Sequence, residues 1–199
     1  MLAQSIDANA TDKEGSTALH MAATYGNSVT AGLLLEKVEI MAVDNQNQNV
    51  LHRAAEEGKA AVVNKVLEYL ENNDVTGTKL KEMMKTRDKR GNTPFMLAVQ
   101  SGNHETLKTF IDKAQSGSYV DVPNIDNECP LHMACRSLTK STISKSHPLI
   151  PRSGDKATTE LLYNTGANIN RLNNHSESPL FIAADYTSNL DLVKFLCEK

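Results

Sequence analysis

The stretch TALHMAATYG, Thr17 to Gly26, decides the fold, because its ten-position pattern returns four more times along the chain. The later copies are NVLHRAAEEG from Asn49, TPFMLAVQSG from Thr93, CPLHMACRS from Cys129 and SPLFIAA from Ser178. Aligned on their fourth position (His20, His52, Met96, His132 and Phe181), successive copies lie 32, 44, 36 and 49 residues apart. The chain therefore reads as an array of similar units.

The residue that opens each copy predicts a helix N-cap. A side-chain oxygen at this position can accept a hydrogen bond from an unpaired N–H of the first helical turn. Such an oxygen is present at Thr17, Asn49, Thr93 and Ser178. Proline then occupies the first helical position in three copies, Pro94, Pro130 and Pro179, where its missing N–H costs nothing. Cys129 is a poor cap, so the fourth copy departs from the pattern.

Each copy predicts a short helix that is buried by its neighbours. One large apolar residue per copy is followed by alanines in the next turn, and the large residues are Leu19, Leu51, Phe95, Leu131 and Leu180. A second apolar segment follows, as in Leu33–Leu35 and Leu192–Leu196. Neither helix carries enough apolar surface to fold alone, so stability must come from contacts between neighbouring units.

A tight turn is predicted five residues before the aligned position. The residues there are Gly15, Asn47, Gly91, Asn127 and Ser176. A hairpin turn at this point needs a positive φ, which Gly allows readily and Asn tolerates. Ser176 fits that role less well.

The repeated pattern, with its TPLHxA core and a spacing near 33 residues, resembles the ankyrin repeat. The resemblance covers nearly the whole chain and implies an all-α solenoid of stacked helix-turn-helix pairs with β-hairpin loops, L-shaped in section, as one domain over residues 1–199.

The expected divisions are 1–11, the tail of a preceding repeat; 12–43; 44–87, with an insert at about 70–87; 88–123; 124–172, with an insert at 138–153; and 173–199, a truncated fifth repeat. Because both ends fall inside a repeat and neither has a polar capping unit, we expect a piece of a longer array, monomeric as a fragment.

The two inserts leave alternatives open. KLKEMMK, Lys79 to Lys85, has Leu80, Met83 and Met84 at helical spacing, which indicates an extra helix that either packs on the array or offers a groove to a partner. The loop LTKSTISKSHPLIPRS, 138–153, is rich in Ser and Thr and has no acidic residue. Such a composition indicates local disorder, or a segment ordered by phosphorylation or by a partner.

Composition excludes several classes of function. Aromatic residues make up 5% of the chain, there is no Trp, and the net charge is −3. No basic stripe interleaved with aromatic residues occurs, which argues against nucleic acid as a partner. The three cysteines show no CxxC spacing, which is typical of reduced thiols in the cytoplasm or nucleus. No apolar run could span a membrane and no signal peptide is evident.

The residues that could carry chemistry are better explained by the scaffold. His20, His52 and His132 recur once per unit, and packed helices lie about 10 Å apart, too far for shared bonds of about 2 Å to a metal ion. Cys129 lies three residues before His132, a spacing at which a nucleophile and a base could meet, but both fall on the repeat core. No phosphate-binding, GxSxG or HExxH motif occurs. We expect no enzyme activity, no cofactor and no metal.

The resemblance implies that the chain binds a protein through the concave face of the solenoid. The expected contact residues on the first helices are Met21, Thr24, Tyr25, Arg53, Glu56, Glu57, Gln100, Ser101, Met133 and Arg136. The hairpin residues expected to add polar contacts are Lys13, Glu14, Gln46, Lys89, Arg90, Asp126 and Glu128. Aromatic residues, Met and Arg are enriched in interface cores, so Met21, Tyr25 and Met133 are the expected anchors.

Two other functions remain open at this point. The irregular repeats with insertions are similar to the cytosolic segment of transient receptor potential channels of the ankyrin type. The array is also compatible with a substrate-recruiting module of an enzyme or ligase whose active domain lies elsewhere. In addition, Leu162, Ile169 and Asn170 are spaced as in ankyrin substrates of asparaginyl hydroxylases, so Asn170 is a possible hydroxylation site or simply a turn residue that bonds its own backbone.

Overall fold

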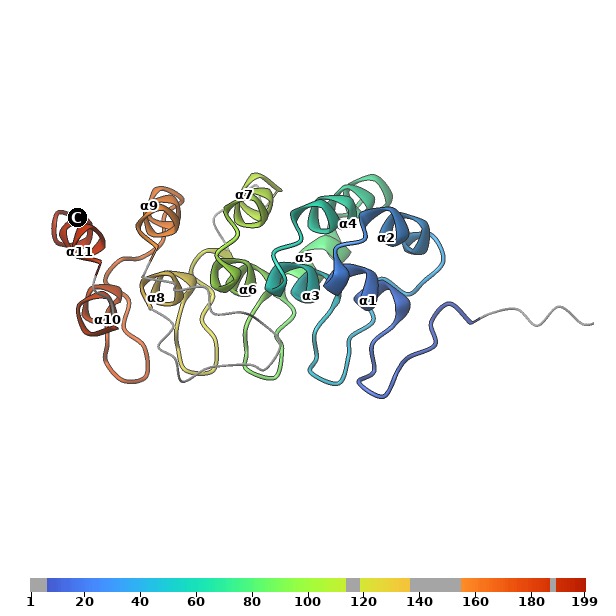
Figure 1. The fold of residues 1–199 in the computed structure, drawn as a ribbon, viewed down its shortest axis with the longest axis horizontal. Helices are drawn as coiled ribbons and strands as arrows, with labels where there is room; N and C mark the ends of the chain where they lie inside the picture. The colour runs from blue at the N-terminus through green and yellow to red at the C-terminus, as the bar shows by residue number, and fades with distance from the viewer. Residues whose placement is uncertain (1–6, 114–118, 137–154, 187–188) are drawn as a thin grey trace, which may run out of the picture. The chain divides into compact units, whose positions relative to one another are not determined.

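The computed structural model describes residues 7–113, 119–136, 155–186 and 189–199, and each copy of the repeat forms a pair of helices (Figure 1). The first helices are α1 (Ala18–Tyr25), α3 (Val50–Glu56), α6 (Pro94–Ser101), α8 (Pro130–Cys135) and α10 (Pro179–Tyr186). The second helices are α2 (Ser28–Leu35), α4 (Ala60–Asn73), α7 (His104–Lys113), α9 (Lys156–Asn164) and α11 (Leu190–Cys197). A further helix, α5 (Thr78–Lys85), follows α4. The inserted loop 138–153 lies outside the described residues.

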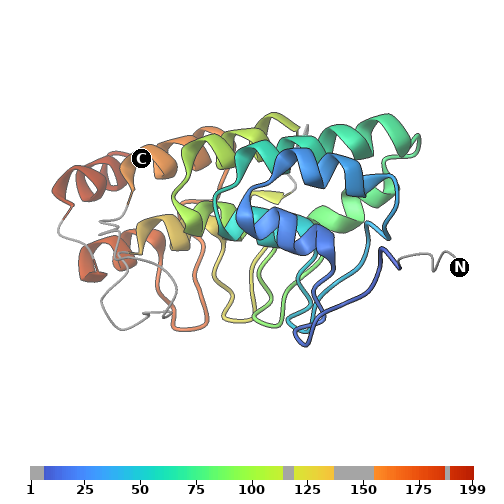
Figure 2. The same ribbon diagram turned by 45° about the vertical axis from the view of Figure 1, so that its right-hand side comes forward.

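The chain divides into two compact units, Met1–Lys113 and Ala114–Lys199. In the first unit, α1, α3 and α6 pack side by side in one layer, and α2, α4 and α7 pack in a second layer above it (Figures 1 and 2). In the second unit, α8 packs on α9 and α10, and α11 packs on α9 and α10. The predicted helical solenoid fold is confirmed, since every described repeat is a helix pair packed on its neighbour within its unit.

A thin apolar core runs between the two layers of the first unit. Leu19, Leu51 and Phe95 are almost completely buried, as the repeat pattern predicts. Phe95 also meets Phe110 of α7 edge to face, with ring centroids 6.4 Å apart. Burying each such side chain contributes roughly 1.5–3 kcal/mol.

Each repeat begins with a five-residue turn, here called a finger. The five fingers are Asp12–Ser16, Asp44–Gln48, Asp88–Asn92, Asn124–Glu128 and Asn173–Glu177. In every finger the N–H of the first residue donates to the carbonyl of the last, over 2.9–3.0 Å. The fourth residue has a positive φ in all five, including 61° at Ser176, so the turn prediction is confirmed where Gly was missing. One isolated bridge, between Thr11 and Thr17, is the only strand-like pairing in the part of the chain that the structure describes.

The first residue of each finger holds the turn with its own side chain. Oδ1 of Asp44 accepts from the N–H groups of Gln46, at 2.8 Å, and Gln48, at 3.0 Å. The same pair of bonds forms at Asp12, Asp88, Asn124 and Asn173. Neighbouring fingers are joined by backbone bonds, such as Lys89 N–H to the carbonyl of Gln46, 2.9 Å.

Helix α5 packs on the array, which decides between the two alternatives for this insert. Met83 and Met84 are buried and Leu80 is half-buried, and α5 contacts α4 and α6 (Figure 2). The side-chain amide of Asn49, the cap of α3, donates to the carbonyl of Met83 over 3.0 Å. The apolar face of α5 is therefore used inside the unit. No described helix is both long and apolar enough to cross a membrane.

Candidate functional site

The first group of candidate contact residues lies on helix α1. Met21 and Tyr25 lie one turn apart, so they share one face of the helix; they are 38% and 75% exposed. Thr24 is half-buried and its hydroxyl donates to the carbonyl of His20 over 3.1 Å. Tyr25 therefore combines a large exposed ring with a fixed helical backbone.

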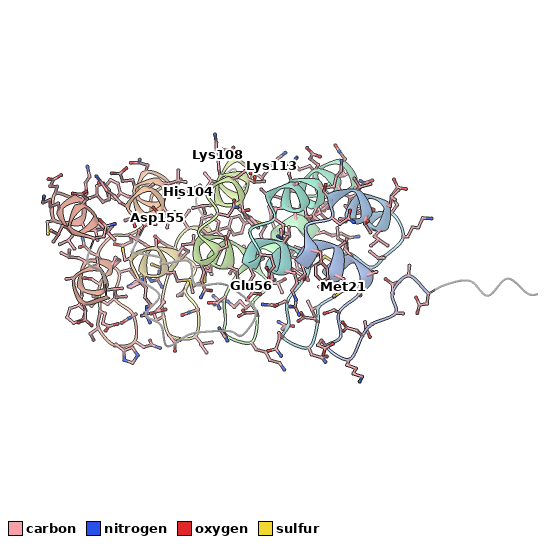
Figure 3. All side chains as sticks on the ribbon, viewed as in Figure 1. Met21, Glu56, His104, Lys108, Lys113 and Asp155 are labelled. Atoms are coloured by element: carbon pink, nitrogen blue, oxygen red, sulfur yellow. The ribbon has the colours of Figure 1, made fainter. Side chains whose placement is uncertain are left out.

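Helix α3 presents mainly charged groups beside α1. Glu56 is exposed and Glu57 is half-buried. Figure 3 shows that Met21 and Glu56 extend from α1 and α3 on the side of the helix layer from which the fingers hang. Since α1 packs directly on α3, these residues lie on one continuous surface of the first unit.

Arg53 is held by an ion pair within its own repeat. Its guanidinium lies 2.5 Å from Oδ2 of Asp44, and Nε donates to the same oxygen over 2.8 Å. The carboxylate of Asp44 is fully buried, while the side chain of Arg53 is 25% exposed. Arg53 therefore fixes the finger to α3 while keeping part of its surface open.

The third repeat contributes Gln100 and Ser101 at the end of α6. Gln100 is exposed and Ser101 is half-buried. The hydroxyl of Ser101 donates to the carbonyl of Ala98 over 2.8 Å. Ser101 thus supports the end of its helix, and Gln100 is the freer of the two to reach a partner.

Met133 and Arg136 belong to the second unit. Met133 is half-buried on α8. Arg136 donates to the carboxylate of Glu128, which lies at the end of its finger. Burial raises the pKa of Glu128, although the Arg136 charge acts in the opposite direction. Eight of the ten predicted contact residues therefore lie on the first unit, and Met133 and Arg136 lie on the second.

The three repeat histidines are structural. Nδ1 of His20, His52 and His132 accepts the N–H of its own helix cap, 3.2 Å away in each case. Nε2 lies 3.1–3.2 Å from a carbonyl oxygen at the end of the finger in the next repeat: that of Gln48, Asn92 or Glu177. Burial lowers the pKa of all three, to about 4 for His52. Each neutral ring therefore links one repeat to the next.

The Cys129 and His132 pair is built like the other caps. Sγ of Cys129 lies 2.9 Å from Nδ1 of His132, and both residues are buried. Burial raises the pKa of the Cys129 thiol and lowers that of His132. Burial thus disfavours both the thiolate and the imidazolium that a nucleophilic pair requires. Burial also raises the pKa of Cys135 to about 12. The described residues contain no group of three His, Cys, Asp or Glu side chains placed to hold a metal ion.

Asn170 lies on an exposed turn of the second unit. Its N–H donates to Oδ1 of Asn168 over 3.0 Å, and Asn168 N–H in turn contacts both carboxylate oxygens of Asp121 at 3.1 Å. The side chain of Asn170 is open to solvent. Its modification remains a prediction.

Two features were missed by reasoning from the sequence. The first is the Asp or Asn at the start of every finger, whose side chain accepts the hydrogen bonds that hold the turn. Its recurrence at Asp12, Asp44 and Asp88 indicates this role in the sequence. The other is a cluster of positive charge around α5 and the third finger. Six of the twelve residues in 79–90 are Lys or Arg, and this charge density is a signal that the apolar spacing of Leu80, Met83 and Met84 does not include.

Comparison with known proteins agrees with this architecture. Residues 1–79 and 77–145 match a family model described as ankyrin repeats (3 copies), and residues 149–196 match one described as ankyrin repeats (many copies). A search of curated proteins gives no match. Among solved structures, the chain is similar to one from "Bd0816 Predatory Endopeptidase from Bdellovibrio bacteriovorus in complex with immunity protein Bd3460". The TM-score is 0.74 and the identity 25%, over 98% of this chain and 87% of that one.

Proposed function

Because this chain belongs to the ankyrin-repeat family, we propose that it is a protein-interaction scaffold that binds a protein partner through the exposed faces of its first helices. The observation that carries the proposal is the α1 surface. Tyr25 is 75% exposed on a helix whose other face is fully packed. A large ring in that position adds little to folding and is free to contact another molecule.

The chemistry of this surface fits a protein partner. Tyr and Met are enriched in the cores of protein interfaces, while their rims are polar and accessible to solvent. Met21 and Tyr25 give the apolar centre, and Glu56 with Gln100 gives a polar border. The similar solved structure is itself a complex between two proteins, which supports a protein as the partner.

The proposed mechanism is recognition by shape, without chemistry. Arg53 and Arg136 are ion-paired inside their repeats, so they orient the fingers and offer only part of their charge to a partner. The three free thiols support a reducing compartment, and we place the module in the cytoplasm or nucleus on that ground.

Affinity capture with Tyr25→Ala and Met133→Ala, alone and together, tests the proposal. Leu33→Ala is the matched control, because Leu33 is 69% exposed but lies on α2, in the second layer. Partners should be lost with Tyr25→Ala and retained with Leu33→Ala. Equal recovery of every partner by all variants would show that the first-helix surface is not the binding face.

A further inference from the structure

The segment from Lys79 to Arg90 carries a concentration of positive charge, and Arg87 is the member of it that the scaffold uses, through a bond to the carbonyl of Gly91. It contains six Lys or Arg residues and two acidic residues, in a chain whose net charge is −3. All six basic side chains are exposed. We call this surface the basic strip: Lys79, Lys81, Lys85, Arg87, Lys89 and Arg90.

Helix α5 fixes the first half of the strip. Its apolar face is held down by Met83 and Met84, and its outer side carries Lys81 and Lys85, one helical turn apart, with the exposed Glu82 beside them. The start of α5 is already closed by Asp74, because Oδ2 of Asp74 accepts the N–H of Leu80 over 3.2 Å. The helix thus presents two lysines outward on a rigid base.

The third finger fixes the second half. Lys89 N–H is bonded to the carbonyl of Gln46, so its backbone is held by the neighbouring finger. Asp88 offers little compensation, since it is buried and its Oδ1 accepts from the N–H groups of Arg90 and Asn92. Arg87 donates to the carbonyl of Gly91 over 3.1 Å. The charges of Lys89 and Arg90 therefore remain directed to solvent.

Carboxylates of the array leave most of the strip unneutralised. No ion pair joins Lys79, Lys81, Lys85, Lys89 or Arg90 to an acidic residue among those the structure describes. Elsewhere in the same unit, the half-buried Lys113 pairs with Glu71 at 2.7 Å. Like charges in a short segment repel one another, and a ligand that supplies negative charge relieves this repulsion.

We propose that the basic strip binds an extended acidic peptide segment, rich in Asp and Glu, of the partner protein. This inference rests on the proposed function, since the segment is taken to belong to the protein that the array binds. The strip runs from helix α5 into the third finger, so its charges are distributed over two successive elements of the chain. Single charges distributed over two elements match side-chain carboxylates spaced along an extended chain.

Other polyanions fit the strip less well. A free phosphate needs converging donors or an open helix N-terminus, and Asp74 closes the one at α5. A lipid surface favours basic segments with exposed apolar side chains, whereas Met83 and Met84 are buried. Single-stranded nucleic acid favours aromatic residues for stacking, and none occurs in residues 79–90.

Fluorescence anisotropy with the full chain tests the site directly. The probe is a fluorescein-labelled peptide in which Glu alternates with Ser, and the comparison peptide has Gln in place of Glu. The test variant carries Lys81→Glu, Lys85→Glu and Lys89→Glu. The matched control carries Lys37→Glu, Lys108→Glu and Lys194→Glu, which are also exposed and change the net charge equally. A third variant carries Lys81→Gln, Lys85→Gln and Lys89→Gln, which removes the three charges without reversing them.

The Glu peptide should bind the unmodified chain, with affinity that falls as salt is raised, and the Gln peptide should not. Reversal of the three strip lysines should weaken binding at least about tenfold, the Gln variant by less, and the control by less than about threefold. Circular dichroism melts confirm that the variants fold. Equal loss in the control and test variants, or no binding of the Glu peptide, would overturn the proposal. So would tighter binding of phosphatidylserine vesicles, single-stranded DNA or inorganic phosphate.

The outcome is separable from that of the proposed function. Loss of partners with Tyr25→Ala, but no binding of the acidic peptide, would reject the basic strip alone. Binding of the peptide through the strip, with capture of partners unaffected by Tyr25→Ala, would reject the first-helix surface alone.

Discussion

The ring Nε2 of His52 lies 3.2 Å from the carbonyl oxygen of Asn92, forty residues further along the chain. On its other side, Nδ1 accepts the N–H of Asn49 over 3.2 Å. One buried side chain therefore closes the cap of its own helix and joins the second repeat to the third. Removing the ring breaks both connections and leaves the Asn92 carbonyl without this partner.

We expect His52→Ala to lower the free energy of unfolding of the first unit by about 2–4 kcal/mol, because it combines a cavity with unpaired buried polar groups. Urea denaturation followed by circular dichroism measures this loss. His175→Ala is the control, since His175 is exposed, and it should change stability by less than about 0.5 kcal/mol. Similar values for the two variants would contradict a linking role for His52.

Stability should fall as the pH is lowered from about 6.5 to about 4. Burial lowers the pKa of folded His52 to about 4, below its ordinary value of 6.5, so the unfolded chain binds more protons in this range. The resulting loss is at most about 3 kcal/mol and is complete below the folded-state pKa. Measuring the free energy of unfolding across this pH range, for the natural chain and for His52→Met, tests this prediction. Met is chosen because Met96 is buried at the same position of the third repeat. If the pH dependence of the free energy of unfolding were unchanged in His52→Met, His52 would be ruled out as its source.

Arg53→Ala should destabilise the first unit by about 1–3 kcal/mol, because it leaves the buried Asp44 carboxylate without its cation. Lys156→Ala breaks an exposed pair with Glu160 at 3.4 Å and should cost less than about 0.5 kcal/mol. Thermal or urea unfolding of both variants gives the comparison. If Arg53→Ala retained full stability, the Arg53 charge would be available mainly for a partner.

The three thiols should differ in reactivity. Cys197 is exposed, whereas Cys129 and Cys135 are buried and burial raises the pKa of both. With Ellman's reagent at neutral pH, the folded chain should release one equivalent of chromophore quickly, and Cys197→Ser should abolish this phase. Rapid reaction of Cys129 would indicate an activated thiol and would reopen the question of a Cys–His pair.

Asn170 should gain one oxygen atom when the chain is incubated with an asparaginyl hydroxylase that acts on ankyrin repeats, because its side chain is exposed. Intact mass and fragment spectra locate the added oxygen. Asn170→Ala should remove it, while Asn168→Ala, two residues away, should not. No gain in mass would leave Asn170 as a turn residue only.

Much of the architecture followed from local pattern. The caps at Thr17, Asn49 and Thr93 predicted the starts of α1, α3 and α6, because a helix needs an acceptor for its first N–H groups at that position. The positive φ at Ser176 was predicted with less force, since nothing in its side chain favours that conformation. Its turn is imposed by Asn173, whose Oδ1 accepts from His175 and Glu177.

The candidate site was less accessible from the sequence. Arg53 was expected to face a partner, but its nearest charge is Asp44, which the finger turns back toward α3. Tyr25 and Glu57 occupy equivalent positions in their repeats, yet Tyr25 is exposed and Glu57 is half-buried. Such differences depend on the neighbouring repeat, and helical spacing within one repeat does not encode them.

The sequence by itself determined the repeat, the helix starts, the turns and the absence of a self-sufficient core in any single repeat, because each of these depends on groups within a few residues of one another. Only the tertiary structure decided which charges are used and which remain open. The Arg53 guanidinium finds Asp44, while the lysines of the basic strip find no carboxylate among the described residues. The physical reason is that burial and ion pairing depend on distances between side chains, and these are set when one repeat packs on the next.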